Sequence, residues 1–343
     1  MGKRANTANA EVFDWLLEES NPSVRYFTLR HLRGAPKDDP EVRRTAAAIM
    51  DRGPVPQILA AQEEDGNWLA AGQFYTGKYR STVWQLMVLA ELGADRSDER
   101  IQRACAFILD RAQDRDSRGF AVSGSAKAGG QHDAVIPCLT GNMVWVLLHF
   151  GWAKDPRVQQ AIDWITTYQR FDDGVQSAPT GWPYDRHEIC WGRHTCFMGV
   201  VKVLKGLAET AKRERSPEVK RTIARGAEFM LLHHIFKRSH NLDRVSKPGW
   251  RHFGFPLMYQ TDALEVLNLL LDLGYRDPRM SEAFDLVESR RGAAGRWALE
   301  NSYNDRLVVP IEEVGRASKW ITLNALRALK RRESVTKAQS GGL

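Results

Sequence analysis

The sequence has few cysteines, little excess charge and no long apolar run, and each shortage excludes a class of protein. Four cysteines in 343 residues cannot make a disulfide scaffold, so we expect reduced thiols and a cytoplasmic protein. No apolar stretch approaches the roughly 18 residues of a membrane span, and the first residues lack the apolar segment of a secretory signal. The net charge is only +7, with basic residues scattered among acidic ones, which argues against nucleic-acid binding.

What the sequence does contain is an internal repeat of apolar and amphipathic helices. Four very apolar helical patterns recur, and three of them end on glycine, the usual residue after a helix C-terminus. Each is followed by a short turn and an amphipathic pattern, which in three cases begins with Asp-Pro or Ser-Pro, a favourable helix start. A fifth apolar pattern follows near the C-terminus. We predict that the apolar helices begin near Ser81, Thr140, Thr195, Thr261 and Lys319.

A third repeated element follows the amphipathic helices. It is clearest at Gln62–Trp68, with the form Gln-x-x-Asp-Gly-x-Trp, and it recurs at Gln169–Val175 and, in degenerate form, at Arg291–Trp297. This pattern is typical of a tight turn in which aspartate caps the backbone, glycine takes a positive φ and tryptophan packs back. Acidic residues here are therefore turn formers before they are catalysts.

Alternating buried and amphipathic helices fit either an open α-solenoid or a double ring. The strongly apolar helices favour the ring, because they must be covered on most sides. We predict an all-α protein with N-terminal helices over residues 1–50, an α/α toroid over 51–332 and a flexible tail over 333–343.

This pattern resembles the α/α toroid of the terpenoid cyclase and protein prenyltransferase superfamily, and bacterial proteins with prenyltransferase or squalene cyclase repeats in particular. The segment Gln62–Trp68 is similar to the QW motif of squalene and hopene cyclases. Two acidic motifs of that superfamily are missing: the nearest match to Asp-x-Asp-Asp is Asp172-Asp173, which lies in a repeat turn, and Asp-Asp-x-x-Asp is absent. A standard terpene cyclase is therefore disfavoured.

Two cysteines and two histidines lie within ten residues, between His187 and Cys196. Thiolate and imidazole are ligands that suit zinc. Prenyltransferase β subunits hold zinc through a histidine in a similar string at an inner-helix start, and His194 matches it. Their cysteine ligand matches Cys138, but Ile136 stands where they have aspartate. Cys190 is then the preferred third ligand, with Asp133 and Asp262 as alternatives. Lanthipeptide cyclases of the LanC type, also toroids, hold zinc with Cys, Cys and His.

Non-metal interpretations remain for these residues. The set Cys138, Cys190 and His194 could equally be a hydrogen-bonded polar cluster, and Cys105 and Cys196 fit core packing. The tandem His233-His234 and His240 look like a helix C-terminal cap and solvent-facing residues rather than metal ligands.

Other candidates would share one side of the ring if the inner-helix starts face the cavity. The expected substrate-binding residues are Tyr75, Tyr79, Trp84, Asn142, Trp191 and Trp320. The expected catalytic residues are His132, Asp133, Tyr259 and Asp262. Asp262 is either a carboxylate at a helix N-terminus or a general base, since a carboxylate in an aromatic pocket has a raised pKa.

The leading hypothesis is an enzyme with an aromatic central cavity and a zinc site, acting on a small apolar substrate that the resemblance suggests is isoprenoid. A non-catalytic lipid-binding toroid and a protein-interaction scaffold are the alternatives.

Overall fold

The computed structural model describes residues 10–340 and is mostly helical, as predicted. Five inner helices alternate along the chain with five outer helices that precede them. The inner helices are α5 (Thr82–Glu91), α7 (Pro137–His149), α10 (Phe197–Glu209), α12 (Ala263–Leu273) and α14 (Lys319–Ser340). The outer helices are α4 (Pro54–Ala60), α6 (Glu99–Ala112), α8 (Pro156–Tyr168), α11 (Pro217–Leu232) and α13 (Ser281–Ser289).

The N-terminal region and the connections add shorter elements. The chain is helical at residues 10–16, then forms α2 (Pro22–Phe27), the π-helical η1 (Thr28–Arg33) and α3 (Pro40–Asp51), and α9 (Glu188–Trp191) precedes α10. Single 3₁₀ turns are η2 (Ala71–Gln73), η3 (His132–Ala134), η4 (Trp152–Lys154), η5 (Lys212–Glu214), η6 (Pro248–Arg251), η7 (Pro278–Met280) and η8 (Asn304–Arg306). Three antiparallel pairs join β1 (Gly124–Ser125) to β2 (Gly129–Gly130), β3 (Lys237–Arg238) to β4 (Asn241–Val245) and β5 (Trp297–Ala298) to β6 (Ala317–Ser318). Helix α14 continues past the predicted boundary at residue 332, and residues 1–9 and 341–343 lie outside the described part.

The predicted helix starts agree with the structure to within three residues. Helices α8 and α11 start at the prolines that follow Asp155 and Ser216, whose side chains accept hydrogen bonds from first-turn backbone amides. Helix α5 is buried at every position from Thr82 to Ala90, whereas the outer helix α6 exposes Arg103 on its far face. The spacing of apolar residues in the sequence therefore distinguished the inner helices from the outer helices correctly.

The turns between outer and inner helices share a set of hydrogen bonds. The Gln62 amide donates to the Arg100 carbonyl at the start of the next outer helix, at 2.9 Å, and the Trp68 indole donates to the Ile58 carbonyl at 2.8 Å. The backbone N–H of Trp68 donates to the hydroxyl of Thr82 on the inner helix, at 3.2 Å. The turn Gln62–Trp68 thus joins two outer helices and an inner helix.

The same threonine bond recurs in other units. It links Phe120 to Thr140 at 3.0 Å, Asp172 to Thr195 at 2.9 Å and Trp297 to Thr322 at 3.0 Å. The turn ending at Phe120 was missed from the sequence, because phenylalanine replaces the tryptophan that marks the pattern.

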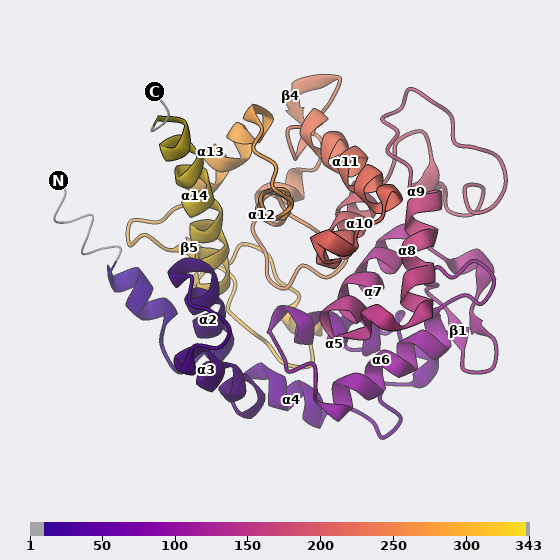
Figure 1. The fold of residues 1–343 in the computed structure, drawn as a ribbon, viewed down its shortest axis with the longest axis horizontal. Helices are drawn as coiled ribbons and strands as arrows, with labels where there is room; N and C mark the ends of the chain where they lie inside the picture. Colours follow the sequence, from indigo (N-terminus) through magenta and orange to yellow (C-terminus); the bar gives the residue numbers. More distant parts are fainter. Residues whose placement is uncertain (1–9, 341–343) are drawn as a thin grey trace.

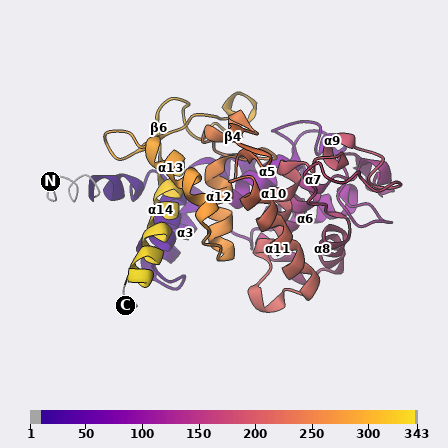
Figure 2. The same cartoon turned by 90° about the horizontal axis from the view of Figure 1, so that it is seen from above.

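The inner helices contact one another in chain order. Helix α5 packs on α7, α7 on α10, α10 on α12, α12 on α14, and α14 on η1 (Figure 1). The N-terminal region in turn contacts the end of α5. A Cβ added at Gly93, just after α5, would lie 3.2 Å from the Phe27 ring of α2. Figure 2 shows α14 running away from the edge of the molecule that carries β4 and β6.

The closest helix contact in this circuit is between α7 and α10. A Cβ at Gly141 would lie 2.5 Å from the backbone of Lys202, and one at Gly206 would lie 2.6 Å from the Gly141 carbonyl oxygen. Because only glycine leaves room for two backbones to approach so closely, these positions set the separation of the two helices.

We expect Gly141→Ala to lower the free energy of unfolding by roughly 1–3 kcal/mol or more, because the neighbour is rigid backbone that cannot give way. Urea unfolding followed by circular dichroism measures this. Gly72→Ala is the matched control, since nothing lies within 4 Å of its added Cβ. Equal stability of the two variants would show that α7 can move away from α10 at little cost.

Candidate functional site

Four of the predicted site residues form an aromatic cluster where the inner helices begin. The ring centroids of Tyr75 and Trp84 are 5.0 Å apart, and those of Trp84 and Tyr259 are 5.9 Å apart. Tyr79 stacks on Tyr303 at 4.2 Å. The structure therefore brings Tyr75, Tyr79, Trp84 and Tyr259 together, and their role in binding or catalysis stays a prediction.

The aromatic cluster already holds a cation from its own chain. The Lys78 ammonium lies 4.9 Å from the centroid of the Tyr259 ring, 5.3 Å from that of Tyr75 and 6.0 Å from that of Trp84. Aromatic faces attract cations at such distances. Lys78 therefore lies over the rings of Tyr75 and Trp84, which were expected to bind substrate, and of Tyr259, which was expected to be catalytic.

The predicted zinc ligands do not come together. Cys138 and Cys190 lie near each other, and burial is the main reason that the pKa of Cys138 is raised and that of Cys190 is raised to about 12. The imidazole of His194 instead faces Asp173, with 3.7 Å between Nδ1 and Oδ1. Within residues 10–340, Cys138, Cys190 and His194 are not a group whose ligand atoms all lie within 4.8 Å of one another. The three residues therefore do not meet as a ligand set in this structure, and their role in binding zinc stays a prediction.

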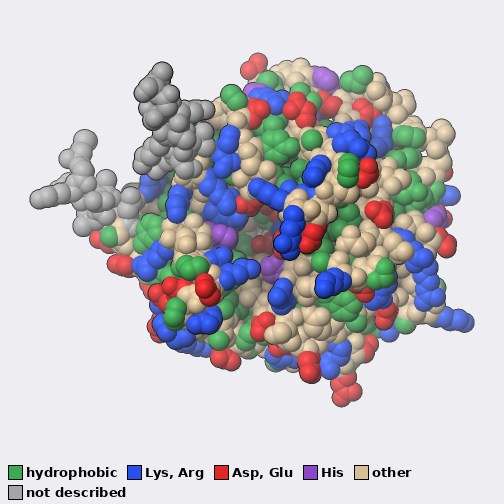
Figure 3. Space-filling view, viewed as in Figure 1, with side chains coloured by type: hydrophobic (Ala, Val, Ile, Leu, Met, Phe, Trp, Pro, Cys, Tyr) green, Lys and Arg blue, Asp and Glu red, His purple; other side chains and the backbone are tan. Residues whose placement is uncertain are grey.

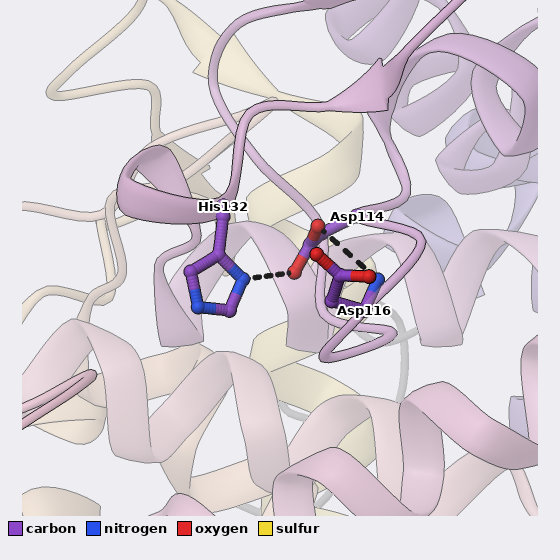
Figure 4. A group of neighbouring side chains, drawn as sticks. All are labelled: Asp114, Asp116 and His132. Atoms are coloured by element: carbon purple, nitrogen blue, oxygen red, sulfur yellow. Dashed lines mark hydrogen bonds and ion pairs between the residues drawn. The ribbon is translucent and has the colours of Figure 1, made fainter.

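One group in the described part of the chain does satisfy that distance, and it consists of Asp114, Asp116 and His132. Figure 4 shows Asp114 between His132 and Asp116. Asp114 accepts hydrogen bonds from His132 Nδ1 at 2.7 Å and from the Ser117 backbone at 2.9 Å. Burial acts to raise the pKa of Asp114, but the hydrogen bonds from Ser117 and His132 outweigh it and lower that pKa. The carboxylate is thus already satisfied by the turn that it stabilises.

The remaining predicted residues lie elsewhere. His132 stacks on Trp182, and the exposed Asp133 side chain pairs with Arg186 at 3.1 Å. Asn142, Trp191 and Trp320 are buried in the core; the ring of Trp320 stacks on Phe255 with 4.2 Å between centroids. Their catalytic and substrate-binding roles stay predictions.

Among the described residues, a cavity with a volume of about 450 Å³ lies between the inner helices. Of the predicted site residues, only Asp262 lines it. The expectation was that the starts of the inner helices would face the cavity. Much of its remaining polar lining comes instead from the C-terminal halves of α5, α7, α10 and α12: Glu91, His149, Lys205, Glu209 and Asp272. Figure 3 shows a hollow near the middle of one face, bordered by acidic, basic and histidine side chains.

A buried ionic network forms one wall of this cavity. Lys202 of α10 donates to both oxygens of Glu265 on α12, at 2.7 and 3.0 Å, and Lys205 pairs with Glu265 at 3.2 Å and with Glu91 of α5. Burial alone would raise the pKa of Glu265, but the two ammonium groups outweigh it and lower that pKa to about 2. Burial is also the main reason that the pKa of Lys202 is lowered. Lys205 Nζ lies 3.8 Å from the centroid of the Trp145 ring, which also lines the cavity.

A second ionic pair also lines the cavity. Arg327 of α14 donates to both oxygens of Asp272 on α12, at 2.6 and 2.8 Å. Burial, together with the charge of Arg327, lowers the pKa of the cavity-lining His31 to about 4, so this imidazole is neutral at pH 7. Opposite charges thus face the cavity from several helices.

Asp262 is both a helix cap and a cavity residue. Its Oδ1 accepts the Glu265 backbone N–H at 2.8 Å, and its Oδ2 accepts the Gly254 backbone N–H at 2.9 Å. In four other units, a threonine hydroxyl accepts the backbone hydrogen bond that corresponds to the one from Gly254. Burial is the largest influence on this group and raises the pKa of Asp262 to about 7, although both backbone hydrogen bonds lower it. The structural role expected for Asp262 is therefore present, and its position leaves the catalytic one open to test.

Most of this site was missed from the sequence, although one signal was available. Lys202 and Lys205 interrupt an otherwise apolar inner helix, three residues apart and so on one face, and Glu265 lies in the first turn of another. Charged residues in a helix that is buried all round require partners, because an isolated buried charge is too costly.

No family model matches the chain, and no curated protein matches it. Nine solved chains do match. A protein from Actinoplanes shares 14% identity over 84% of this chain and 99% of its own, with a TM-score of 0.30. A type II terpene cyclase from Scytonema, solved with its substrate geranylgeranyl dihydroxybenzoate, shares 15% identity over 92% of this chain and 87% of its own, with a TM-score of 0.39. Similarity at this level assigns no activity to the chain. No helix among residues 10–340 is both long and apolar enough to cross a membrane.

We expect Glu265→Gln to lower the free energy of unfolding by about 3–5 kcal/mol, because it leaves two buried ammonium groups with a single carboxylate. Chemical unfolding at neutral pH measures the loss. The control is Glu228→Gln, which breaks the exposed pair with Arg279 and should cost at most about 1 kcal/mol. A similar small effect of both changes would mean that water reaches the network.

The raised pKa of Asp262 predicts a particular pH dependence of stability. The folded protein holds this proton up to about pH 7, whereas the unfolded chain releases it near about pH 4. Stability therefore falls with rising pH across this window, by up to roughly 1.4 kcal/mol per pH unit, and is constant above it. In Asp262→Asn this contribution is absent. In urea unfolding, the stability of the variant relative to the wild type should therefore rise as the pH increases through this window. A pH-independent difference would show that the two backbone amides outweigh burial.

Proposed function

We propose that the chain is an enzyme built as an α/α ring, in which the central cavity binds a small amphiphilic molecule and Asp262 transfers a proton to or from it. The observation that carries the proposal is a cavity of about 450 Å³ among the inner helices with a buried carboxyl group on its wall whose pKa is about 7. Small-molecule sites usually have about 300–1,000 Å³. The contact circuit from α5 through α14 to η1 supports the ring.

The acid–base assignment follows from two neighbouring carboxyl groups with separated pKa values. Asp262 is half protonated near pH 7, whereas Glu265, one helical turn later, is held ionised by Lys202 and Lys205. Environments that push two pKa values apart are typical of an acid and its ionised partner. Asp262 would give or take the proton, and the network around Glu265 would fix the charge pattern that orients the substrate.

The lining of the cavity favours a substrate with an apolar body and a polar end. Its apolar wall comes from the loop before α12 and from α12 and α14: Phe255, Leu257, Leu264, Leu269 and Ile321. The ionic wall contains Glu91, Lys205 and the His149–Glu209 pair, which lies at 3.4 Å. An isoprenoid with a polar head fits this description, and only the family resemblance favours isoprenoids over other apolar bodies.

The zinc implied by the resemblance has no part in this proposal. Cys138 and Cys190 could contribute two of its ligands, but a third would have to replace His194, whose ring faces Asp173. A second candidate function is binding without turnover. It is favoured by the two backbone hydrogen bonds to Asp262, which occupy both of its oxygens.

We expect the cavity to bind a dansyl group linked to a charged tail, and fluorescence titration tests this. Dansylcadaverine and dansylglycine share one apolar ring system and carry opposite charges, so the tighter binder reports the charge that the ionic wall prefers. At least one of them should saturate at one molecule per chain. Ala208→Trp, which places an indole in the cavity, should weaken binding at least about tenfold, equivalent to 1.4 kcal/mol.

Ala211→Trp is the matched control, because Ala211 is exposed just after α10 and does not line the cavity. Binding of both probes that is unchanged in Ala208→Trp, or that never saturates, would overturn the proposal. If binding follows the expected pattern, a second measurement separates the two candidate functions. Chemical conversion of a bound amphiphile by the wild type that is lost in Asp262→Asn supports the enzyme. Binding without any conversion supports the second candidate.

A further inference from the structure

Two polar side chains on the wall of the central cavity have no hydrogen-bonding partner in the described part of the chain. His31 of η1 and Asn324 of α14 both line the cavity, and η1 packs against α14. Among residues 10–340, neither the imidazole nitrogens of His31 nor the side-chain amide of Asn324 makes a hydrogen bond or an ion pair. Both side chains are half-buried. Their hydrogen-bonding capacity is therefore left for whatever the cavity holds.

The fold holds the His31 ring in place as a neutral group. The ring stacks on Phe27, another cavity residue, with 5.7 Å between centroids and 4° between planes. His31 lies in a π-helical turn, in which the Gly34 N–H donates to the Leu29 carbonyl, and such turns are frequent at functional sites. Burial and the charge of Arg327 lower the pKa of His31 to about 4. At pH 7 one of its nitrogens therefore donates a hydrogen bond and the other accepts one.

A second asparagine positions Asn324. Asn268 Nδ2 on α12 donates to the backbone carbonyls of Leu264 and Asn324, each at 3.1 Å, and so ties α12 to α14. Asn268 also lines the cavity and is 6% exposed, and its Oδ1 has no donor among the described residues. A buried oxygen without a donor is costly. The side of the cavity formed by α12, α14 and η1 therefore offers neutral hydrogen-bonding groups that lack partners.

The charged side chains of the lining, by contrast, are paired with one another. Lys205 pairs with Glu91 and Glu265. Arg327 pairs with Asp272 at 2.6 Å. A charged group on a ligand would have to break one of these pairs or be buried without a counter-charge, and both are costly. The groups that the protein leaves unpaired on the cavity wall thus favour an uncharged partner.

We propose that the polar end of the ligand is uncharged, a hydroxyl or a carboxamide, and that His31 and Asn324 bind it. The inference rests on the proposed function, because it requires that the cavity bind an amphiphile. A hydroxyl and a carboxamide each donate and accept hydrogen bonds, which matches a neutral imidazole and the amide of Asn324. A site built for such a group discriminates against an analogue that lacks it, because polar groups of the protein would then stay unpaired. His31 and Asn324 are thus specificity-determining residues.

Fluorescence titration of the full chain with two further dansyl probes tests the proposal. N-(2-hydroxyethyl)dansylamide ends in a hydroxyl, and N-propyldansylamide has a methyl group in its place. The hydroxyethyl probe should bind at least about fivefold more tightly than the propyl probe, and more tightly than dansylglycine and dansylcadaverine. In both His31→Phe and Asn324→Leu this preference should fall, while the propyl probe still saturates and so shows that the cavity is intact. His252→Phe is the matched control, because His252 is exposed and does not line the cavity.

Three results would overturn the inference and leave the proposed function standing. One is saturable binding of the propyl probe that is as tight as that of the hydroxyethyl probe. Another is tighter binding of a charged probe; for dansylcadaverine this would place the polar end at Glu209, which is 36% exposed and faces His149 at 3.4 Å. The third is a hydroxyl preference that persists in both His31→Phe and Asn324→Leu. If none of the probes saturates, the cavity binds no amphiphile, and the proposed function fails together with the inference.

Discussion

The buried ionic network of Glu91, Lys202, Lys205 and Glu265 is the constraint on which the rest of the structure depends. The charges of Lys202, Lys205 and Glu265 would be too costly to bury without partners, so α5, α10 and α12 must present these residues and Glu91 to one another in a single arrangement. This requirement fixes how the three helices are rotated about their axes. It thereby decides which residues line the cavity and places Trp145 beneath Lys205.

A different interaction, the repeated hydrogen bond from a turn to the next inner helix, ties each of these helices to the segment before it. Threonine hydroxyls accept these bonds in four units, and the Asp262 carboxylate accepts the corresponding one from Gly254. A carboxylate at this position satisfies two backbone donors where a hydroxyl satisfies one. Its cost is a buried acidic group, which is also what makes Asp262 suitable for proton transfer.

Chemically reactive side chains are therefore distributed over separate places in the fold. The aromatic cluster lies at the inner-helix starts and is covered by Lys78, while the ionic cavity draws on the C-terminal halves of the same helices. The histidines that surround Asp173, namely His194, His233 and His240, lie outside both. The packing of the inner helices allows this separation, because each of them has two ends and a middle that meet different neighbours.

The sequence by itself determined the helices, their caps, the two helix types and most of the turns, because these depend on local spacing and on residues such as Pro156 and Gly66. It also grouped Tyr75, Trp84 and Tyr259 correctly, since all lie where inner helices begin. Only the tertiary structure decided which end of the inner helices lines the cavity. That choice depends on how partners such as Lys205 and Glu265, 60 residues apart, neutralise each other, and on backbone pairing that turns His194 toward Asp173 rather than toward its sequence neighbour Cys190.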